Sequence, residues 1–385
     1  MLNHTWPKHG LNPEWTHFVQ LAWMLMDSFF VMSGFLITGI LLDSRSRPDY
    51  YRSFYVRRAL RILPIYYLVI TLVTCVAVFH GHEPYRQMLA QWGSPAWFFV
   101  YLGNIPTALT SFNPMGGGGS YVPLWSLQVE EQFYLLFPLL VHRLRMQTLA
   151  RVLLGLACFS TILRIAIYLW NPGNLLVQFV LLPCRMEGLA FGGWIAIRFR
   201  MGPWKVSKKG LTVMTAIWVA IACMPTLWGG YHQTQPFNRT IGLLLSPIAF
   251  AHVVLWLVLF RGSRLTAPLR LAPVQYIGKV SYAAYLLHWP VADMLKGVSV
   301  AAGIHVFDRN VPRIAAVYIL TFLCSALSWH FFEKPLLSLK DRLYPSRPVQ
   351  GQGLVQASGR DEAARDGDAI AEQAGPQRHE ALQTG

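Results

Sequence analysis

Residues 125–140 are WSLQVEEQFYLLFPLL, an apolar stretch of helical length that carries two adjacent carboxylates, Glu130 and Glu131. A charge at the centre of a membrane helix costs on the order of 2.5–3.5 kcal/mol on insertion scales. Chains that keep such a charge generally use it for chemistry, for transport or for pairing with another charge. The alternative is that both carboxylates stand in water at a helix end. Similar polar groups in other apolar runs favour the first interpretation.

The composition predicts an all-α, polytopic transmembrane helix bundle. Of the 385 residues, 54% are hydrophobic, 14% are aromatic and only 13% are charged, against about 25% in soluble domains. The mean hydropathy is positive. The net charge of +15 comes from Lys and Arg in short loops between apolar runs. This is the positive-inside pattern of membrane proteins, so we expect no nucleic-acid partner.

Nine apolar runs are each near the ~20 residues that a membrane crossing needs. They cover residues 25–43, 62–80, 125–142, 150–170, 177–197, 210–229, 239–260, 277–297 and 313–333. We assign residues 1–335 to one membrane domain. Residues 336–385 are polar and rich in Gly, Ala, Gln, Asp and Arg, which predicts a disordered cytoplasmic tail.

Residues 92–110 form a further, ambiguous run. If this run does not span, five basic segments fall on one face of the membrane, and the opposite segments hold only Lys8, Arg86 and Arg309. The five segments are 44–61, 143–149, 198–209, 261–276 and the residues after 333. We therefore expect residues 81–124 to form a long outer loop, with the N-terminus outside and the C-terminus in the cytoplasm.

Several polar groups could carry chemistry. The stretch FYVRRALRILP holds Arg57, Arg58 and Arg61, whose spacings place them on neighbouring helical faces. Such a group of guanidinium side chains suits phosphate binding. The alternative is a plain positive-inside anchor. Glu130 and Tyr134 are four residues apart and share a face, whereas Glu131 points about 100° away. The same stretch of sequence also contains Trp125, Ser126 and Gln132.

Three further segments place polar residues inside apolar runs. Ser33 and Gly34 allow close approach of another helix, and Asp27 at the start of that run suits the helix dipole. Arg185 is a candidate partner for a Glu of another helix or for an anionic ligand, and the alternative is a structural pair with Glu187. Ser281, Tyr285 and His288 fall on one helical face and suggest a ligand cavity; a buried structural histidine is the alternative. Glu333 is interpreted as structural.

Six blocks of the sequence together resemble the acyltransferase 3 family, the bacterial integral-membrane O-acyltransferases that modify surface carbohydrates. They are FFVMSGFLITGIL, FYVRRALRILP, PLWSLQVEEQFYLLFPLL, the helix of Arg185, IGKVSYAAYLLHWP and FFEKP. Single blocks are moderately specific, but all six occur in family order from about residue 27 to 335. The resemblance implies ten membrane helices, of which the first starts with an arginine and closes in a catalytic histidine.

In this chain LNHTWP, residues 2–7, matches the end of that first helix. The resemblance therefore implies that His4 is the catalytic base, and that the first helix and its arginine are missing. It also implies that Glu130 orients or charge-balances a polar group of the site, and that Arg58 and Arg61 hold the phosphates of a donor.

We therefore expect a multi-pass protein of the bacterial inner membrane that moves an acyl group, most commonly acetyl, from acyl-CoA to a hydroxyl of an exported carbohydrate. A polysaccharide or lipopolysaccharide would be the acceptor. No residues have metal-ligand spacing, so we expect no metal and no permanently bound cofactor. The alternative is a transporter or flippase of a polar lipid or sugar, for which Glu130, Arg185 and His288 would line the path. Transporters often contain internal repeats, and the halves of this chain show no clear self-similarity.

Overall fold

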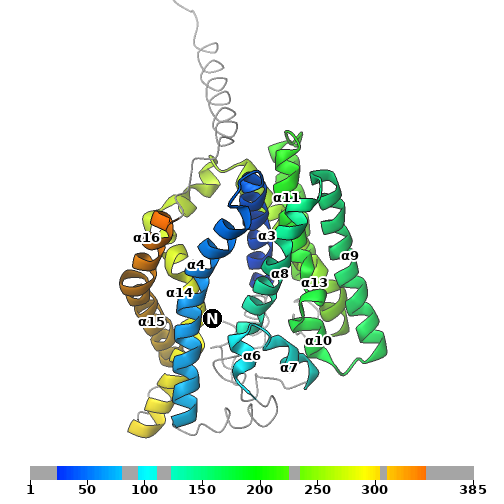
Figure 1. The fold of residues 1–385 in the computed structure, drawn as a ribbon. Helices are drawn as coiled ribbons and strands as arrows, with labels where there is room; N and C mark the ends of the chain where they lie inside the picture. Colours follow the sequence, from blue (N-terminus) through cyan, green and yellow to red (C-terminus); the bar gives the residue numbers. More distant parts are fainter. Residues whose placement is uncertain (1–23, 80–93, 111–122, 225–234, 304–309, 344–385) are drawn as a thin grey trace, which may run out of the picture. The chain divides into compact units, whose positions relative to one another are not determined.

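The computed structural model describes residues 24–79, 94–110, 123–224, 235–303 and 310–343, and every regular element in these ranges is helical (Figure 1). The chain divides into two units, residues 1–340 and 341–385. All elements that concern the candidate site belong to the first unit. The predicted all-α helix bundle is confirmed.

The main helices follow the predicted apolar runs, with shifted ends. They are α3 (Leu25–Ser44), α4 (Tyr50–Phe79), α8 (Leu124–Arg143), α9 (Met146–Trp170), α11 (Met186–Arg200), α12 (Lys208–Cys223), α13 (Leu243–Leu259), α14 (Ala272–Ala302) and α15 (Asn310–Ser328). Shorter elements join them: α6 (Ala96–Phe99), α7 (Asn104–Leu109), α10 (Leu175–Val180), η4 (Leu182–Cys184), η6 (Asn238–Gly242), η7 (Arg264–Arg270), η9 (Trp329–Glu333) and α16 (Lys334–Leu343).

Five stretches of the described chain are long and apolar enough to cross a membrane. They are Leu25–Ser44, Tyr50–Val76, Met146–Trp170, Asn238–Leu259 and Pro312–Leu339. The predicted runs 125–142, 177–197, 210–229 and 277–297 are not among them. For α8 the reason is visible in its sequence, because Glu130, Glu131 and two glutamines interrupt the apolar run.

Three boundary predictions are wrong. The run 177–197 is not one helix: it breaks into α10, η4 and α11 around Pro183, which cannot donate a backbone hydrogen bond. Residues 50–61, predicted as part of a loop, are the first turns of α4. Residues 336–343, predicted as the start of a disordered tail, continue α16. The ambiguous run, by contrast, follows the interpretation that it does not span: its described residues 94–110 form only the short helices α6 and α7.

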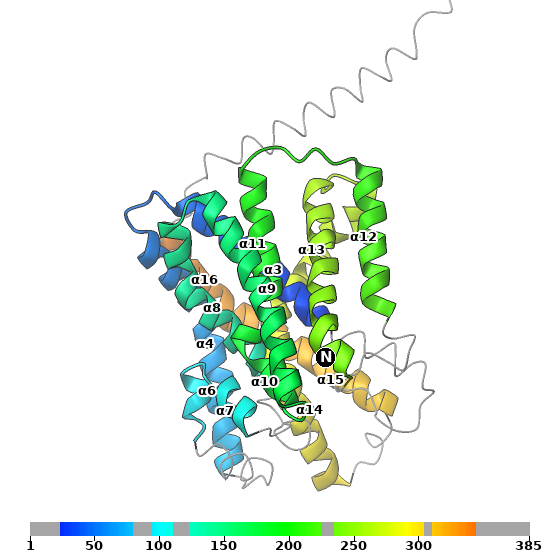
Figure 2. The same cartoon turned by 90° about the vertical axis from the view of Figure 1, so that its right-hand side faces the viewer.

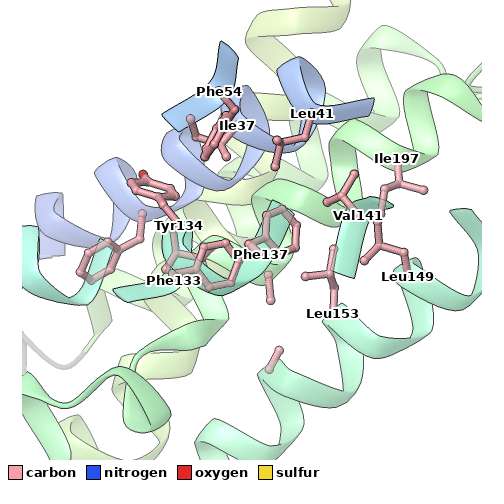
Figure 3. Packing of buried hydrophobic residues seen from close by; sticks show 14 of the residues in the cluster. Ile37, Leu41, Phe54, Phe133, Tyr134, Phe137, Val141, Leu149, Leu153 and Ile197 are labelled. Atoms are coloured by element: carbon pink, nitrogen blue, oxygen red, sulfur yellow. The ribbon is translucent and has the colours of Figure 1, made fainter. Parts of the chain in front are cut away.

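The centre of the fold is the contact between α3 and α11, which small residues make possible. A Cβ atom on Gly34 would overlap the backbone of Leu189, and one on Gly192 would overlap the backbone of Val31. The two helices therefore lie with their backbones in direct contact, as small residues allow in membrane proteins. Beside them, the apolar side chains of α8, among them Phe137 and Val141, pack against α3, α9 and α11 (Figure 3).

The predicted basic segments gather at one end of this unit. Arg45, after α3, donates to the carbonyl oxygen of His142 near the end of α8. Arg200 at the end of α11 pairs with Asp43 at the end of α3, at 2.6 Å. Lys208 at the start of α12 donates to Ser263, between α13 and η7. Helices α12 and α13 lie side by side in Figure 2. The segments 44–61, 143–149, 198–209 and 261–276 thus share one end, as the charge pattern predicted.

Candidate active site

A guanidinium and two carboxylates meet where α4 contacts α8. The Nη2 and Nε atoms of Arg58 each lie 3.2 Å from Oε1 of Glu131. Both side chains are largely buried, with 16% and 19% of their surface exposed. The charge of Arg58 also acts on Glu130, the neighbouring carboxylate. Both glutamates therefore share one arginine, although they point in different directions from α8.

Hydroxyl groups of two helices lie near Glu130. Its carboxylate is influenced by the side-chain hydroxyls of Ser33 of α3 and Tyr134 of α8. The Tyr134 hydroxyl also donates to Oγ of Ser33 at 2.5 Å. The guanidinium of Arg58 lies over the Tyr134 ring, 3.4 Å from its centroid, which is a cation–π contact. Glu130 and Tyr134, predicted to share a helical face, thus influence one another, and α3 contributes Ser33 to the same cluster.

Helix α14 joins the same region through hydroxyl groups. The Tyr285 hydroxyl donates to the carbonyl oxygen of Pro123 at 2.5 Å and lies 2.6 Å from Oγ of Ser126. Glu130 acts electrostatically on Tyr285. His288 is buried, and its Nδ1 lies 2.6 Å from the backbone oxygen of Tyr285. Ser281 instead donates to the carbonyl oxygen of Gly278 within its own helix, so the structure does not bring it to this cluster.

The three arginines of the predicted donor site separate along α4. Arg58 contacts the carboxylates, whereas Arg61 is exposed and its charge acts on Glu333. Arg57 is half-buried on the neighbouring face. The structural interpretation of Glu333 agrees with its contacts, because Ser328 donates to its Oε1 at 3.0 Å.

A second buried network lies between α3, α9 and α11. Arg185 pairs with Asp27 at 2.7 Å, and both side chains are 2% exposed. Three aromatic rings surround its guanidinium, with centroids 5.3–5.7 Å away: Phe30, Trp125 and Phe179. Trp125 therefore belongs with Arg185 and not with Glu130. Asp27 acts as the partner of a buried arginine, so the interpretation as a helix-dipole residue missed its main contact.

The proposed structural pair of Arg185 with Glu187 is wrong, because Glu187 pairs with Arg164 of α9. Thr161 donates to Oε1 of Glu187 at 2.9 Å. Arg164 is fully buried and also donates to the backbone oxygens of Cys184 and Thr240. Sequence reasoning missed Arg164, although a lone arginine in the apolar run ACFSTILRIAIYLW was a signal of the kind that identified Arg185.

A third feature missed from the sequence is the turn between α6 and α7. Gln132 of α8 donates through Nε2 to the backbone oxygen of Tyr101 and to Oδ1 of Asn104, each at 2.9 Å. Asn104 donates in turn to the backbone oxygen of Val180 at 3.0 Å. This turn therefore lies against the same helix that carries Glu130 and Glu131. His4, the predicted base, lies outside the described residues, so its role stays a prediction.

Comparison with known proteins matches nearly the whole chain to one family. A family model described as an acyltransferase domain matches residues 2–330. The peptidoglycan O-acetyltransferase OatA of Listeria monocytogenes is 27% identical over 348 residues, which cover 87% of this chain and 52% of the relative. The O-acetyltransferase OatA of Staphylococcus aureus is 28% identical over 346 residues, which cover 85% of this chain and 54% of the relative. The chain spans about half the length of these relatives. No solved structure matches it.

Proposed function

The chain belongs to the acyltransferase 3 family of membrane proteins. From this premise we propose that it transfers an acyl group, most commonly acetyl, from acyl-CoA to a hydroxyl of a carbohydrate at the outer face of the membrane. The observation that carries the proposal is the partly buried cluster of Arg58, Glu130 and Glu131, which lies near the hydroxyls of Ser33 and Tyr134. The matched family segment contains the whole cluster.

In this reaction the acceptor hydroxyl oxygen attacks the carbonyl carbon of the thioester. A carbon–oxygen bond forms, the carbon–sulfur bond breaks, and the hydroxyl proton ends on the sulfur of coenzyme A. A base must take that proton during attack. His4 remains our candidate for the base. Glu130, which lies near the hydroxyls of Ser33 and Tyr134, orients or charge-balances the base or the attacking hydroxyl. Arg58 limits the repulsion between the two adjacent carboxylates, because its charge acts on both.

The donor enters from the end of the bundle where the basic segments gather. Arg61 is exposed on α4 and can meet a phosphate directly, because a guanidinium forms strong charge-assisted hydrogen bonds to phosphate oxygens. Arg58 is already held by Glu131, so its contact with a donor requires that pair to loosen. Arg61→Ala should therefore raise the KM for acyl-CoA more than Arg58→Ala does.

The acceptor is proposed to be a glycan of the cell envelope. One of the two relatives carries peptidoglycan in its printed name. The exported polysaccharides and lipopolysaccharide expected from the sequence share the same chemistry, a secondary or primary sugar hydroxyl. The protein would sit in the bacterial inner membrane as a multi-pass enzyme, with the donor on the cytoplasmic side and the C-terminus in the cytoplasm.

The test is acyl transfer by the full-length protein in proteoliposomes. Labelled acetyl-CoA is supplied with a tetrasaccharide of N-acetylglucosamine or with de-O-acetylated cell-wall glycan, and the ester is identified by mass spectrometry. Glu130→Gln should abolish the ester, whereas Glu131→Gln should leave more activity. Asp49→Asn is the matched control, since Asp49 precedes α4 and pairs with nearby Arg47. Movement of glycan without an ester would support the transporter alternative and contradict the proposal.

A further inference from the structure

Tyr101 has a backbone conformation that non-glycine residues rarely adopt. Its φ angle is 58°, and it is the only non-glycine residue with a positive φ in the described ranges. A bulky side chain in the left-handed region is disfavoured by contact between its Cβ atom and the backbone. Such conformations persist only where the surroundings enforce them, and they concentrate at functional sites. The position therefore needs an explanation from its surroundings.

Hydrogen bonds and close packing enforce this turn. The backbone oxygen of Tyr101 accepts from Gln132, and its backbone nitrogen donates to the carbonyl oxygen of Phe98 at 3.1 Å. Leu102 donates to the carbonyl oxygen of Trp97 at 2.8 Å. Gly103 leaves no room for a side chain, because a Cβ atom there would lie 2.7 Å from the Phe98 ring. The turn is thus held in one conformation by its own residues and by α8.

The ring of Tyr101 is held as firmly as its backbone. It stacks on Tyr66 of α4, with centroids 4.2 Å apart and planes inclined by 22°. It also meets Tyr67 edge to face at 6.3 Å. The hydroxyl groups of Tyr66 and Tyr67 are used structurally, because they donate to the backbone oxygens of Phe98 and Phe99. These contacts fix where the Tyr101 hydroxyl lies.

The Tyr101 hydroxyl is buried and makes no hydrogen bond within the described chain. The side-chain amide of Gln128, which is fully buried against Gly103, likewise has neither its oxygen nor its nitrogen paired there. Buried polar groups are nearly always paired in proteins, because leaving them without a partner is unfavourable. Two such groups beside one enforced turn indicate that something outside the described residues completes their hydrogen bonding.

Tyr101 is also linked to the helix of the candidate active site, because Gln132, the neighbour of Glu131, donates to its backbone oxygen. Glu131 and Tyr282 both act electrostatically on Tyr101. Burial raises the pKa of the Tyr101 hydroxyl above its ordinary value, with smaller contributions from these groups. The hydroxyl therefore keeps its proton at neutral pH and is available as a hydrogen-bond donor.

We propose that Tyr101, supported by Gln128, is a specificity-determining residue that binds a hydroxyl of the acceptor sugar beside Glu131. This inference rests on the proposed function. The acceptor is favoured over the donor because Tyr66, on which Tyr101 stacks, lies eight residues beyond Arg58 along α4. That distance is about 12 Å toward the end of α4 that leads into the predicted outer loop. The donor is proposed to enter from the opposite end.

The test compares Tyr101→Phe with Tyr67→Phe in proteoliposomes, using acetyl-CoA and the N-acetylglucosamine tetrasaccharide. Tyr101→Phe keeps the stacked ring and removes a hydroxyl that has no partner in the described chain, so its melting temperature should not fall. Its KM for the tetrasaccharide should rise about two- to tenfold, which corresponds to one neutral hydrogen bond. The KM for acetyl-CoA should not change.

Tyr67→Phe makes the same chemical change at a hydroxyl that already donates to Phe99, so it should lower stability without changing the acceptor KM. An unchanged acceptor KM in Tyr101→Phe, or a rise in the acetyl-CoA KM instead, overturns this inference alone. A wild-type protein that forms no ester overturns the proposed function, and the inference with it.

Discussion

Replacing Arg164 by methionine should lower the free energy of unfolding by about 3–5 kcal/mol, the usual cost of removing one partner of a buried ion pair. Arg164 is fully buried and pairs with Glu187. Its guanidinium also donates to the backbone oxygens of Cys184, at 2.5 Å, and Thr240, at 3.2 Å. The substitution leaves a buried carboxylate and two carbonyl groups without this donor. Folded proteins retain only about 5–15 kcal/mol of net stability, so the loss is large.

The assay is thermal and denaturant unfolding in detergent, followed by intrinsic tryptophan fluorescence. The double variant Arg164→Met with Glu187→Gln removes both charges and should recover more than half of the loss. Asp43→Asn is the control, because the Arg200–Asp43 pair is about 30% exposed and should contribute less than about 1 kcal/mol. Equal losses for Arg164→Met and Asp43→Asn would refute the reasoning that desolvation sets the cost. A double variant as unstable as the sum of the single variants would refute it too.

Three further predictions concern packing, topology and the base. Gly34→Ala should lower the free energy of unfolding by roughly 1–3 kcal/mol, because the new Cβ atom forces α3 away from Leu189. Gly155 has open space beside it, so Gly155→Ala should be neutral or slightly stabilising. Melting temperatures of the two variants test this difference. Cysteines placed at positions 52 and 117 of a cysteine-free variant should react with an impermeant maleimide from opposite faces, and labelling from the same face would contradict the topology. His4→Ala should abolish ester formation while His9→Ala and His17→Ala retain it. An active His4→Ala variant would move the base elsewhere, with His288 as the next candidate.

The helices themselves could be predicted from the sequence, because burial in lipid requires long apolar runs and nearly every long run forms a helix. The break at Pro183 could not be predicted with the same certainty. Proline is tolerated inside α8, at Pro138, and inside α14, at Pro290, yet at Pro183 the chain leaves the helix. The preceding Leu181 is already extended, with ψ of 138°, so the break involves the packing of the whole segment and not proline alone.

The charged residues of the candidate site were predictable, but their partners were not. A charge in an apolar run is visible in sequence, and this signal identified Glu130, Arg58 and Arg185. Spacing along one helix predicts only neighbours on that helix. For Arg185 the sequence predicted a glutamate of another helix or an anionic ligand, with Glu187 as the alternative, and it could not identify Asp27 of α3, the partner 158 residues away. The Tyr101 turn was invisible for the same reason, since its backbone is fixed by contacts from α4 and α8.

The corrected start of α4 also changes how the positive charges bear on topology. Because α4 begins at Tyr50, Arg58 lies eight residues, or about 12 Å, inside a helix and is paired with Glu131. A charge neutralised at that depth is a weak signal of orientation. Residues within about 15–20 positions of a span end still count, so Arg45, Arg47 and Arg52 carry the prediction for this segment. Their end of the bundle also holds the basic segments after α8, α11 and α13. The topology prediction therefore does not depend on Arg58. Labelling at position 52 tests it at the basic residue nearest the start of α4.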